Sequence, residues 1–274
     1  VALKLEQMQH TGSFKARGAF NTLLSEPVPE AGVVAASGGN HGAAVAYAAR
    51  ALGHPARIFV PEMAGPAKIA LIRRTGAELS VVPGEYANAL EAARTFENES
   101  GAMQVHAYDA EPTVAGQGTL ALEWQEQGLE ADTLLIAVGG GGLIAGALAW
   151  FDGDRRIVAV EPETSCALHA ALEAGAPVDV QVSGVAANAL GARRIGGICH
   201  RLASAHLGAS VLVPDSAILE AQQRLLVEPA GACALAALLS GAYVPAPGER
   251  VAVLLCGGNI APDPLGDQLS PTVG

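Results

Sequence analysis

The chain has 274 residues, of which 50% are apolar and 16% are charged, and its formal net charge is −11. This length suits one large α/β unit or two intertwined lobes, and the apolar content argues against a disordered chain. The negative charge leaves no basic face for phosphodiesters, so we expect a small-molecule partner and no nucleic acid.

The cysteines and the hydropathy pattern indicate the cellular compartment of the protein. No apolar run reaches the ~18 residues of a membrane span, and no basic segment precedes a short apolar one as in a signal peptide. Four cysteines lie along the chain without CxxC spacing: Cys166, Cys199, Cys233 and Cys256. This spacing argues against a zinc cluster and favours reduced thiols. We therefore expect a cytoplasmic protein with no membrane partner.

Apolar runs typical of strands alternate along the chain with segments of helical periodicity. Strand and helix pairs are expected within 1–24, 33–53, 56–76, 79–101, 102–128, 133–150, 155–175 and 211–225, before a helix at 231–242 and a strand from 250. Pro66 and Gly76 mark the start and end of one of these helices. Continuous apolar strands separated by helices predict a doubly wound parallel sheet, followed by a tail at 260–274.

Ligands of such sheets bind beyond the carboxyl ends of the strands, and one loop there contains four consecutive glycines. In "VGGGGLIAGA", residues 139–142 separate an apolar strand from a helix. Their amides and the helix N-terminus would form a phosphate site. The alternative is a tight turn, which one or two glycines would suffice to make.

Two further loops follow strands. Ser37, Asn40 and His41 of "SGGNHG" precede an Ala-rich helix. Asn40 alone would be explained as a helix cap, but the whole group, with its exposed amides, suits a small carboxylate. In "LLCGGN", Cys256 ends a strand. A lone cysteine is usually a small core residue, and only its position makes it a candidate.

Lys15 lies among small and apolar residues in "HTGSFKARGAFNTLL". If Ser13 caps a helix there, Lys15 is in its first turn, where burial and the helix dipole both favour the uncharged amine. Lysines on helices more often extend to solvent. Together with a phosphate site and a carboxylate loop, however, an uncharged amine indicates a Schiff-base lysine that holds pyridoxal phosphate.

Six motifs support one family in particular: "LKLEQMQHTGSFKARGA", "SGGNHG", "AGQGTLALE", "VGGGGLIAGA", "VEPAGA" and "LLCGGN". In them the chain resembles, over nearly its whole length, the threonine/serine dehydratase group of fold-type II pyridoxal-phosphate enzymes. The resemblance implies a tryptophan synthase β-like α/β fold of two doubly wound parallel-sheet lobes, with the cofactor in the cleft between them. It also implies a large cofactor-binding domain of residues 1–31 and 110–274 and a small domain of residues 32–109 that carries the carboxylate loop.

The resemblance assigns roles to single residues. Lys15 would form the Schiff base, Phe14 would pack beside the cofactor ring, and Cys256 would face the pyridine nitrogen. Asn40 would reach the ring hydroxyl, and Glu228 would lie near the ring. The phosphate would be bound by Gly139, Gly140, Gly141 and Gly142. The substrate carboxylate would be bound by Ser37, Gly39, Asn40 and His41.

The residue opposite the pyridine nitrogen indicates the reaction. A thiol at Cys256 would hold that nitrogen protonated less well than a carboxylate, so expulsion of a β-leaving group is favoured over transamination. We expect an eliminase that converts L-threonine or L-serine to a 2-oxo acid and ammonia, with Lys15 as general base for the α-proton. Two alternatives stay open: a related lyase or β-replacement enzyme, such as a hydroxyaspartate dehydratase, and a catalytically silent binding module. Racemisation is disfavoured, because racemases of the group carry a serine where this chain has Gly38.

Three further expectations come from the family. Glu161 matches a cation ligand, but Ala167 stands where relatives that bind divalent ions have an acid, so a monovalent cation is the prediction. A homodimer is expected. Relatives have a few dozen residues before the first strand and a longer segment between Leu225 and Leu226, so we expect residues to be absent from this sequence at both places.

Overall fold

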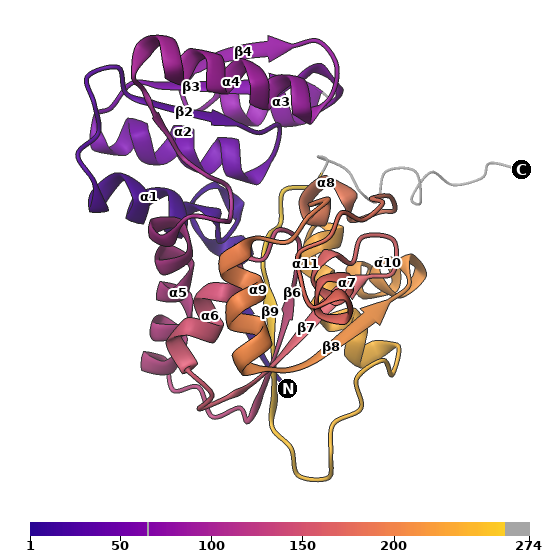
Figure 1. Cartoon of the computed structure of the whole chain (residues 1–274). Coiled ribbons are helices and arrows are strands. Elements are labelled where there is room, and N and C mark those ends of the chain that lie inside the picture. The colour runs from indigo at the N-terminus through magenta and orange to yellow at the C-terminus, as the bar shows by residue number, and fades with distance from the viewer. Residues whose placement is uncertain (65, 261–274) are drawn as a thin grey trace, which may run out of the picture.

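The computed structural model describes the backbone of residues 1–64 and 66–260, which form two parallel β-sheets (Figure 1). The expected tail lies outside these residues, apart from residue 260. The five-stranded sheet has the order β1 (Ala2–Leu5), β9 (Val251–Leu255), β6 (Thr133–Ala137), β7 (Arg156–Pro162) and β8 (Leu207–Val213). The four-stranded sheet has the order β4 (Glu78–Val82), β3 (Ala56–Pro61), β2 (Val33–Ala36) and β5 (Met103–Gln104). Two all-parallel sheets confirm the predicted doubly wound α/β fold with two lobes.

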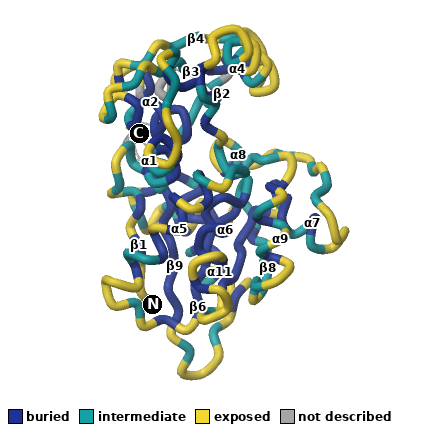
Figure 2. The backbone as a smooth tube through the Cα atoms, turned by 60° about the vertical axis from the view of Figure 1, so that its left-hand side comes forward, coloured by how far each residue is buried: buried dark blue, intermediate teal, exposed yellow. Residues whose placement is uncertain are grey.

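Helices cover both faces of each sheet, which explains why the central strands are apolar throughout. In the four-stranded sheet, α2 and α4 pack on opposite faces. In the other, α5, α6 and α9 lie side by side, and α11 packs on β9, β6 and β7 with α10 beside it (Figure 1). The central strands β9 and β6 are buried along their whole length (Figure 2). The α-helices are α1 (Lys15–Ser25), α2 (Asn40–Leu52), α3 (Pro66–Arg73), α4 (Tyr86–Ser100), α5 (Glu111–Glu126), α6 (Gly142–Phe151), α7 (Ala167–Ala174), α8 (Ala187–Leu190), α9 (Gly197–His206), α10 (Asp215–Gln222) and α11 (Pro229–Leu239).

Helix α1 touches both lobes. It packs against α2 above and α5 below (Figure 1). Its contact with α5 is close because glycines face each other: a Cβ on Gly116 would lie 2.7 Å from the Cα of Gly18. This approach leaves room for no larger side chain at either position.

The prediction that Ser13 caps α1 is wrong. Ser13 has extended backbone and forms an isolated antiparallel bridge with Gly257, and the residue that precedes the helix is Phe14, which makes no side-chain cap. The Ser13 hydroxyl is buried, and no hydrogen-bond partner for it is found in the described part of the chain. Strand-like pairing with the loop after β9 therefore overrides the local capping preference of serine.

The connection around Leu225 forms compact hydrogen-bonded turns. Val227 N donates to Leu225 O at 2.9 Å, and Gln222 Nε2 donates to Val227 O at 3.0 Å. The chain thus reverses between α10 and α11 within residues 223–228. Among the helices in the described ranges, none is long and apolar enough to cross a membrane.

Candidate functional site

The strand order of the large sheet brings three predicted loops together. Because β1, β9 and β6 are neighbours and parallel, the segments that follow their carboxyl ends meet at one edge. Phe14 N donates to Cys256 O at 3.2 Å, so the start of α1 is attached to the end of β9. Lys15 and Cys256, which are far apart in the sequence, are therefore close in space, so the ionisation of either one affects the pKa of the other.

The side chain of Lys15 points inward. Its Nζ donates to the carbonyl oxygen of Ala107 at 2.7 Å and lies 5.1 Å from the centroid of the Phe14 ring. Burial lowers the pKa of Lys15 to about 8, while the nearby Cys256 thiolate would raise it. An amine with a pKa of about 8 is roughly one-tenth uncharged at pH 7 and half uncharged at pH 8, far more than an ordinary lysine, so it can act as nucleophile or base.

Each glycine of the tetraglycine turn lies close to a residue from another part of the chain. A Cβ on Gly140 would overlap the ring of Tyr108, and one on Gly142 would lie 2.9 Å from the Tyr108 Cα. Gly141 has φ +93°, and a Cβ there would overlap the Cys199 sulfur. Helix α6 begins at Gly142, so its free amides open onto this turn. Glycine is therefore needed at these positions because other residues lie close to the turn. A simple tight turn would not need glycine at all of them.

One short segment joins Lys15 to this turn. Ala107 accepts the hydrogen bond from Lys15, and the next residue, Tyr108, covers Gly140 and Gly142. The lysine amine and the tetraglycine turn are thus both in contact with the chain between β5 and α5.

A second group of polar side chains connects the two sheets. Asn40 Nδ2 donates to Glu228 Oε1 at 2.6 Å, and Asn259 Nδ2 donates to Asn40 Oδ1 at 2.9 Å and to Thr11 O at 2.7 Å. A Cβ on Gly257 would overlap the Glu228 carboxylate. Asn40 therefore does not cap α2, because both ends of its amide are used in this group.

The loop before α2 presents its backbone. Ser37 Oγ accepts a hydrogen bond from Gly39 N at 3.1 Å, and α2 begins at Asn40. The imidazole of His41 is buried, and its Nε2 lies 2.9 Å from the Val105 carbonyl, to which it must donate. Burial, and then the positive charge of Lys15, lower the pKa of His41 to about 3, so this ring stays neutral. A neutral ring leaves the amide of His41, at the start of α2, as the group that can attract a carboxylate.

Cys256 is a buried thiol. Its Sγ donates to Ala230 O at 3.5 Å. Burial raises the pKa of Cys256, and the carboxylate of Glu228 raises it further. The Cys256 side chain at the end of β9 is therefore an uncharged thiol.

Glu161, the predicted cation ligand, lies apart from this cluster at the start of α7. Its two carboxylate oxygens accept hydrogen bonds from Leu168 N and His169 N, both at 2.8 Å. Burial raises the pKa of Glu161 to about 7, and these amides oppose the shift. Residues 1–64 and 66–260 contain no group of three or more His, Cys, Asp and Glu side chains placed to hold a metal ion. The monovalent cation stays a prediction.

Sequence reasoning missed three contributors to the site. Asn259 ends the motif "LLCGGN", which drew notice for Cys256, and Tyr108 lies in a segment expected only as a strand followed by a helix. In α8, the Asn188 carbonyl lies 3.9 Å from a Cβ placed on Gly39, and the Leu190 Cα lies 2.9 Å from one placed on Gly139. Helix α8 therefore touches both glycine loops, and no local motif announces such a contact.

Comparison with known proteins identifies the family. A family model described as "Pyridoxal-phosphate dependent enzyme" matches residues 1–257. The chain belongs to this family of pyridoxal-phosphate-dependent enzymes.

Its relatives include several lyases. It is 38% identical to a phenylserine dehydratase of Ralstonia pickettii over 94% of this chain and 82% of the relative. It is 35% identical to an L-threonine ammonia-lyase of Thermotoga maritima over 95% of this chain and 67% of the relative. Among solved structures, a threonine deaminase of T.th. matches with a TM-score of 0.87 and 35% identity, covering 94% of this chain and 87% of that one. Maize serine racemase matches with a TM-score of 0.90 and 29% identity, covering 97% and 85%.

The residues of the site fit pyridoxal phosphate. The tetraglycine turn leads into the N-terminus of α6, which has no side-chain cap, so its free backbone amides can donate to a phosphate group. Lys15 offers an amine of lowered pKa for the cofactor aldehyde. Cys256 offers an uncharged thiol at the end of β9. This strand lies between β1, which leads to Lys15, and β6, which leads to the tetraglycine turn.

Proposed function

We propose that this pyridoxal-phosphate-dependent enzyme is a dehydratase, which removes the β-hydroxyl group of a hydroxy-amino acid and releases a 2-oxo acid and ammonia. The observation that carries the proposal is the inward-pointing Lys15 amine with a pKa of about 8, on the edge shared with Cys256 and the tetraglycine turn. The names of the relatives, a phenylserine dehydratase and threonine ammonia-lyases, support the substrate class.

We assign each step to residues of this chain. The bound cofactor supplies an electron-withdrawing group that weakens the bond between the α-carbon and its hydrogen. Lys15 Nζ would hold the cofactor until the substrate amine takes its place, and the freed Lys15 amine would then accept the α-proton. We assign the substrate carboxylate to Ser37, Gly39, Asn40 and His41, with the amides of Asn40 and His41 at the start of α2 as its donors. This arrangement fixes the α-carbon beside the amine.

The remaining residues hold the cofactor. We assign the phosphate to residues 139–142 and the start of α6, and the ring to Phe14, Asn40 and Glu228. The uncharged thiol of Cys256 would face the pyridine nitrogen. A thiol stabilises a protonated nitrogen less than a carboxylate does, which favours rapid loss of the β-hydroxyl.

We also propose the coarser organisation that the sequence suggested. Residues 1–31 and 110–274 would form the large domain and residues 32–109 the small one, which is consistent with the membership of the two sheets. A homodimer in the cytoplasm is proposed, and the four free thiols support a reducing compartment. A monovalent cation near Glu161 is proposed from the family resemblance.

A visible spectrum followed by turnover tests the function. The purified protein loaded with pyridoxal phosphate should absorb in the visible, and L-threonine, L-serine and L-threo-3-phenylserine should yield 2-oxo acid and ammonia in equal amounts. Lys15→Ala should lose the visible band and at least about 100-fold of turnover.

Other outcomes select the alternatives. Diversion of the substrate by added thiol or indole would indicate a β-replacement enzyme. A preparation that binds no pyridoxal phosphate would indicate a binding module. Conversion of L-serine to D-serine faster than to pyruvate would indicate a racemase.

A further inference from the structure

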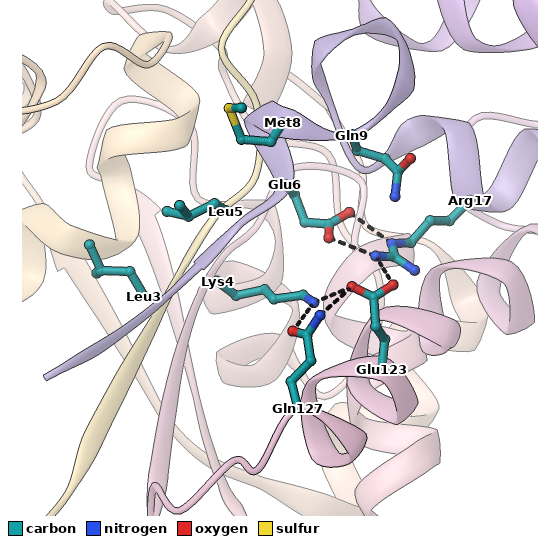
Figure 3. Close-up of a pocket in the computed structure, with 9 residues that line it drawn as sticks. All are labelled: Leu3, Lys4, Leu5, Glu6, Met8, Gln9, Arg17, Glu123 and Gln127. Carbon is teal, nitrogen blue, oxygen red and sulfur yellow. Dashed lines mark hydrogen bonds and ion pairs between the residues drawn. The ribbon is translucent and has the colours of Figure 1, made fainter.

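The first strand and the residue after it turn their charged side chains inward and their apolar side chains outward. Lys4 is 6% exposed and Glu6 is 2% exposed, whereas Leu3 is 40% and Leu5 is 47% exposed. Figure 3 shows Leu3 and Leu5 on the side of the strand away from Lys4 and Glu6. Replacing buried ion pairs by apolar residues is often neutral or stabilising, so stability alone does not account for the burial of these charges.

The buried charges converge on Arg17 of α1. The guanidinium forms two parallel bonds with Glu6, from Nε to Oε2 and from Nη2 to Oε1, both at 2.8 Å. Its Nη2 also lies 2.7 Å from Glu123 Oε2 of α5, and Glu123 in turn pairs with Lys4 (Figure 3). The Arg17 side chain is only 9% exposed. A forked guanidinium held by two carboxylates fixes direction as well as distance.

This network borders a cavity of about 410 Å³ beside β1, and it holds α1 against two neighbours at once. Glu6 follows β1, and Glu123 belongs to α5. Arg17 is two residues after Lys15, so the two side chains leave the helix about 160° apart, on nearly opposite sides. The network thus binds one side of the first turn of α1, while Lys15 extends from the other side.

Helix α1 has no side-chain N-cap. Apart from its packing against α2 and α5, its start is attached by the bond from Phe14 N to Cys256 O and by the bridge between Ser13 and Gly257. The direction of the Lys15 amine toward Ala107 therefore depends on how the helix is held.

We propose that Arg17, held by Glu6 and Glu123, is a positioning residue that sets where the Lys15 amine stands relative to the cofactor. A reacting group displaced by about 1 Å can lose about 100-fold in rate. The inference rests on the role proposed for Lys15.

Arg17→Lys tests it, because the charge is kept and the forked geometry is lost. The matched control is Arg250→Lys. Arg250 forms a comparable forked pair with Asp132 on the exposed surface. The full chain has three lysines, Lys4, Lys15 and Lys68, so acetylation of the cofactor-free protein at a series of pH values can be followed at Lys15 by mass spectrometry.

In Arg17→Lys, the acetylation midpoint of Lys15 should rise toward the ordinary lysine value of about 10.4, because the amine leaves its buried position. The visible cofactor band should appear at least about ten-fold more slowly, and kcat should fall about 10- to 100-fold with a much smaller change in KM. Arg250→Lys should leave all three readings unchanged.

A purely structural role for Arg17 would lower the melting temperature and leave the Lys15 midpoint and the rate of cofactor uptake at their original values, which would overturn the proposal. If Arg17→Lys does not fold, Glu6→Gln provides the same readings and the same criterion. Retention of the cofactor band and turnover in Lys15→Ala would instead overturn the proposed function, and would do so whatever Arg17→Lys shows.

Discussion

Asn40 Nδ2 donates a 2.6 Å hydrogen bond to Glu228 Oε1, and this bond joins the first residue of α2 to the residue that precedes α11. It connects a helix of the four-stranded sheet to a helix of the five-stranded one. The two sheets are thereby coupled at the edge where Lys15 and Cys256 meet.

We expect this bond to contribute to stability. Because the acceptor is a carboxylate, a double-mutant cycle of Asn40→Ala and Glu228→Gln should give a coupling free energy of about 1.5–3 kcal/mol in urea unfolding. Asn21 offers the control, since its amide donates at 2.7 Å to the neutral carbonyl of Pro112. Asn21→Ala should show no coupling to Glu228→Gln, and equal coupling of both asparagines would contradict the expectation.

The lowered pKa of Lys15, about 8, predicts two pH dependences in the cofactor-free protein. Between that value and about 10.4, the unfolded chain binds more protons than the folded one, so the free energy of unfolding should rise with pH across this window. Below pH 8 the cost of the buried charge is fully present. The rate of cofactor uptake should also rise with pH, with its midpoint near 8.

Urea unfolding and stopped-flow absorbance measure these two quantities. Lys15→Met should abolish the rise in stability between pH 8 and 10, since it removes the titrating amine. A rise of the same size in Lys15→Met would show that another group is responsible.

Two glycines with nearly the same positive φ allow an effect on phosphate binding to be distinguished from the effect of backbone strain. Gly141 has φ +93° and Gly153 has φ +91°, but a Cβ on Gly141 would overlap Cys199, whereas one on Gly153 would meet nothing within 4 Å. Both alanine variants should lose roughly 1–2 kcal/mol from the left-handed conformation. Only Gly141→Ala should also weaken pyridoxal phosphate binding, by at least about ten-fold, in an absorbance titration. Equal affinities in the two variants would place the phosphate elsewhere.

Gly38 is expected to decide between elimination and racemisation. Gly38→Ser would add the hydroxyl that racemases of the group carry, and measurable D-serine should form from L-serine. The Cβ would overlap that of Ala64, so Ala64 must move for the serine to fit. Chiral chromatography measures the product, and Gly38→Ala is the control for size alone. Racemisation that is unchanged in Gly38→Ser would contradict the placement.

The sequence by itself determined the elements and the reactive groups. Alternating apolar runs and helical periodicity predicted the parallel α/β fold, and glycine-rich segments marked the loops after β2, β6 and β9. These features are local, because periodicity and the conformational freedom of glycine act within a few residues. The same holds for Lys15, whose small and apolar neighbours already indicated a partly buried amine.

Only the tertiary structure decided how these parts meet. The order β1-β9-β6, which brings the Lys15, Cys256 and tetraglycine loops to one edge, comes from pairing between strands far apart in the chain. The contacts of Asn259 with Asn40, of Tyr108 with Gly140 and of Arg17 with Glu123 arise in the same way. Ser13 shows the limit of local rules, because its pairing with Gly257 replaces the helix cap that its residue type predicts. Long-range packing outweighs local propensity wherever it buries more surface and satisfies more hydrogen bonds.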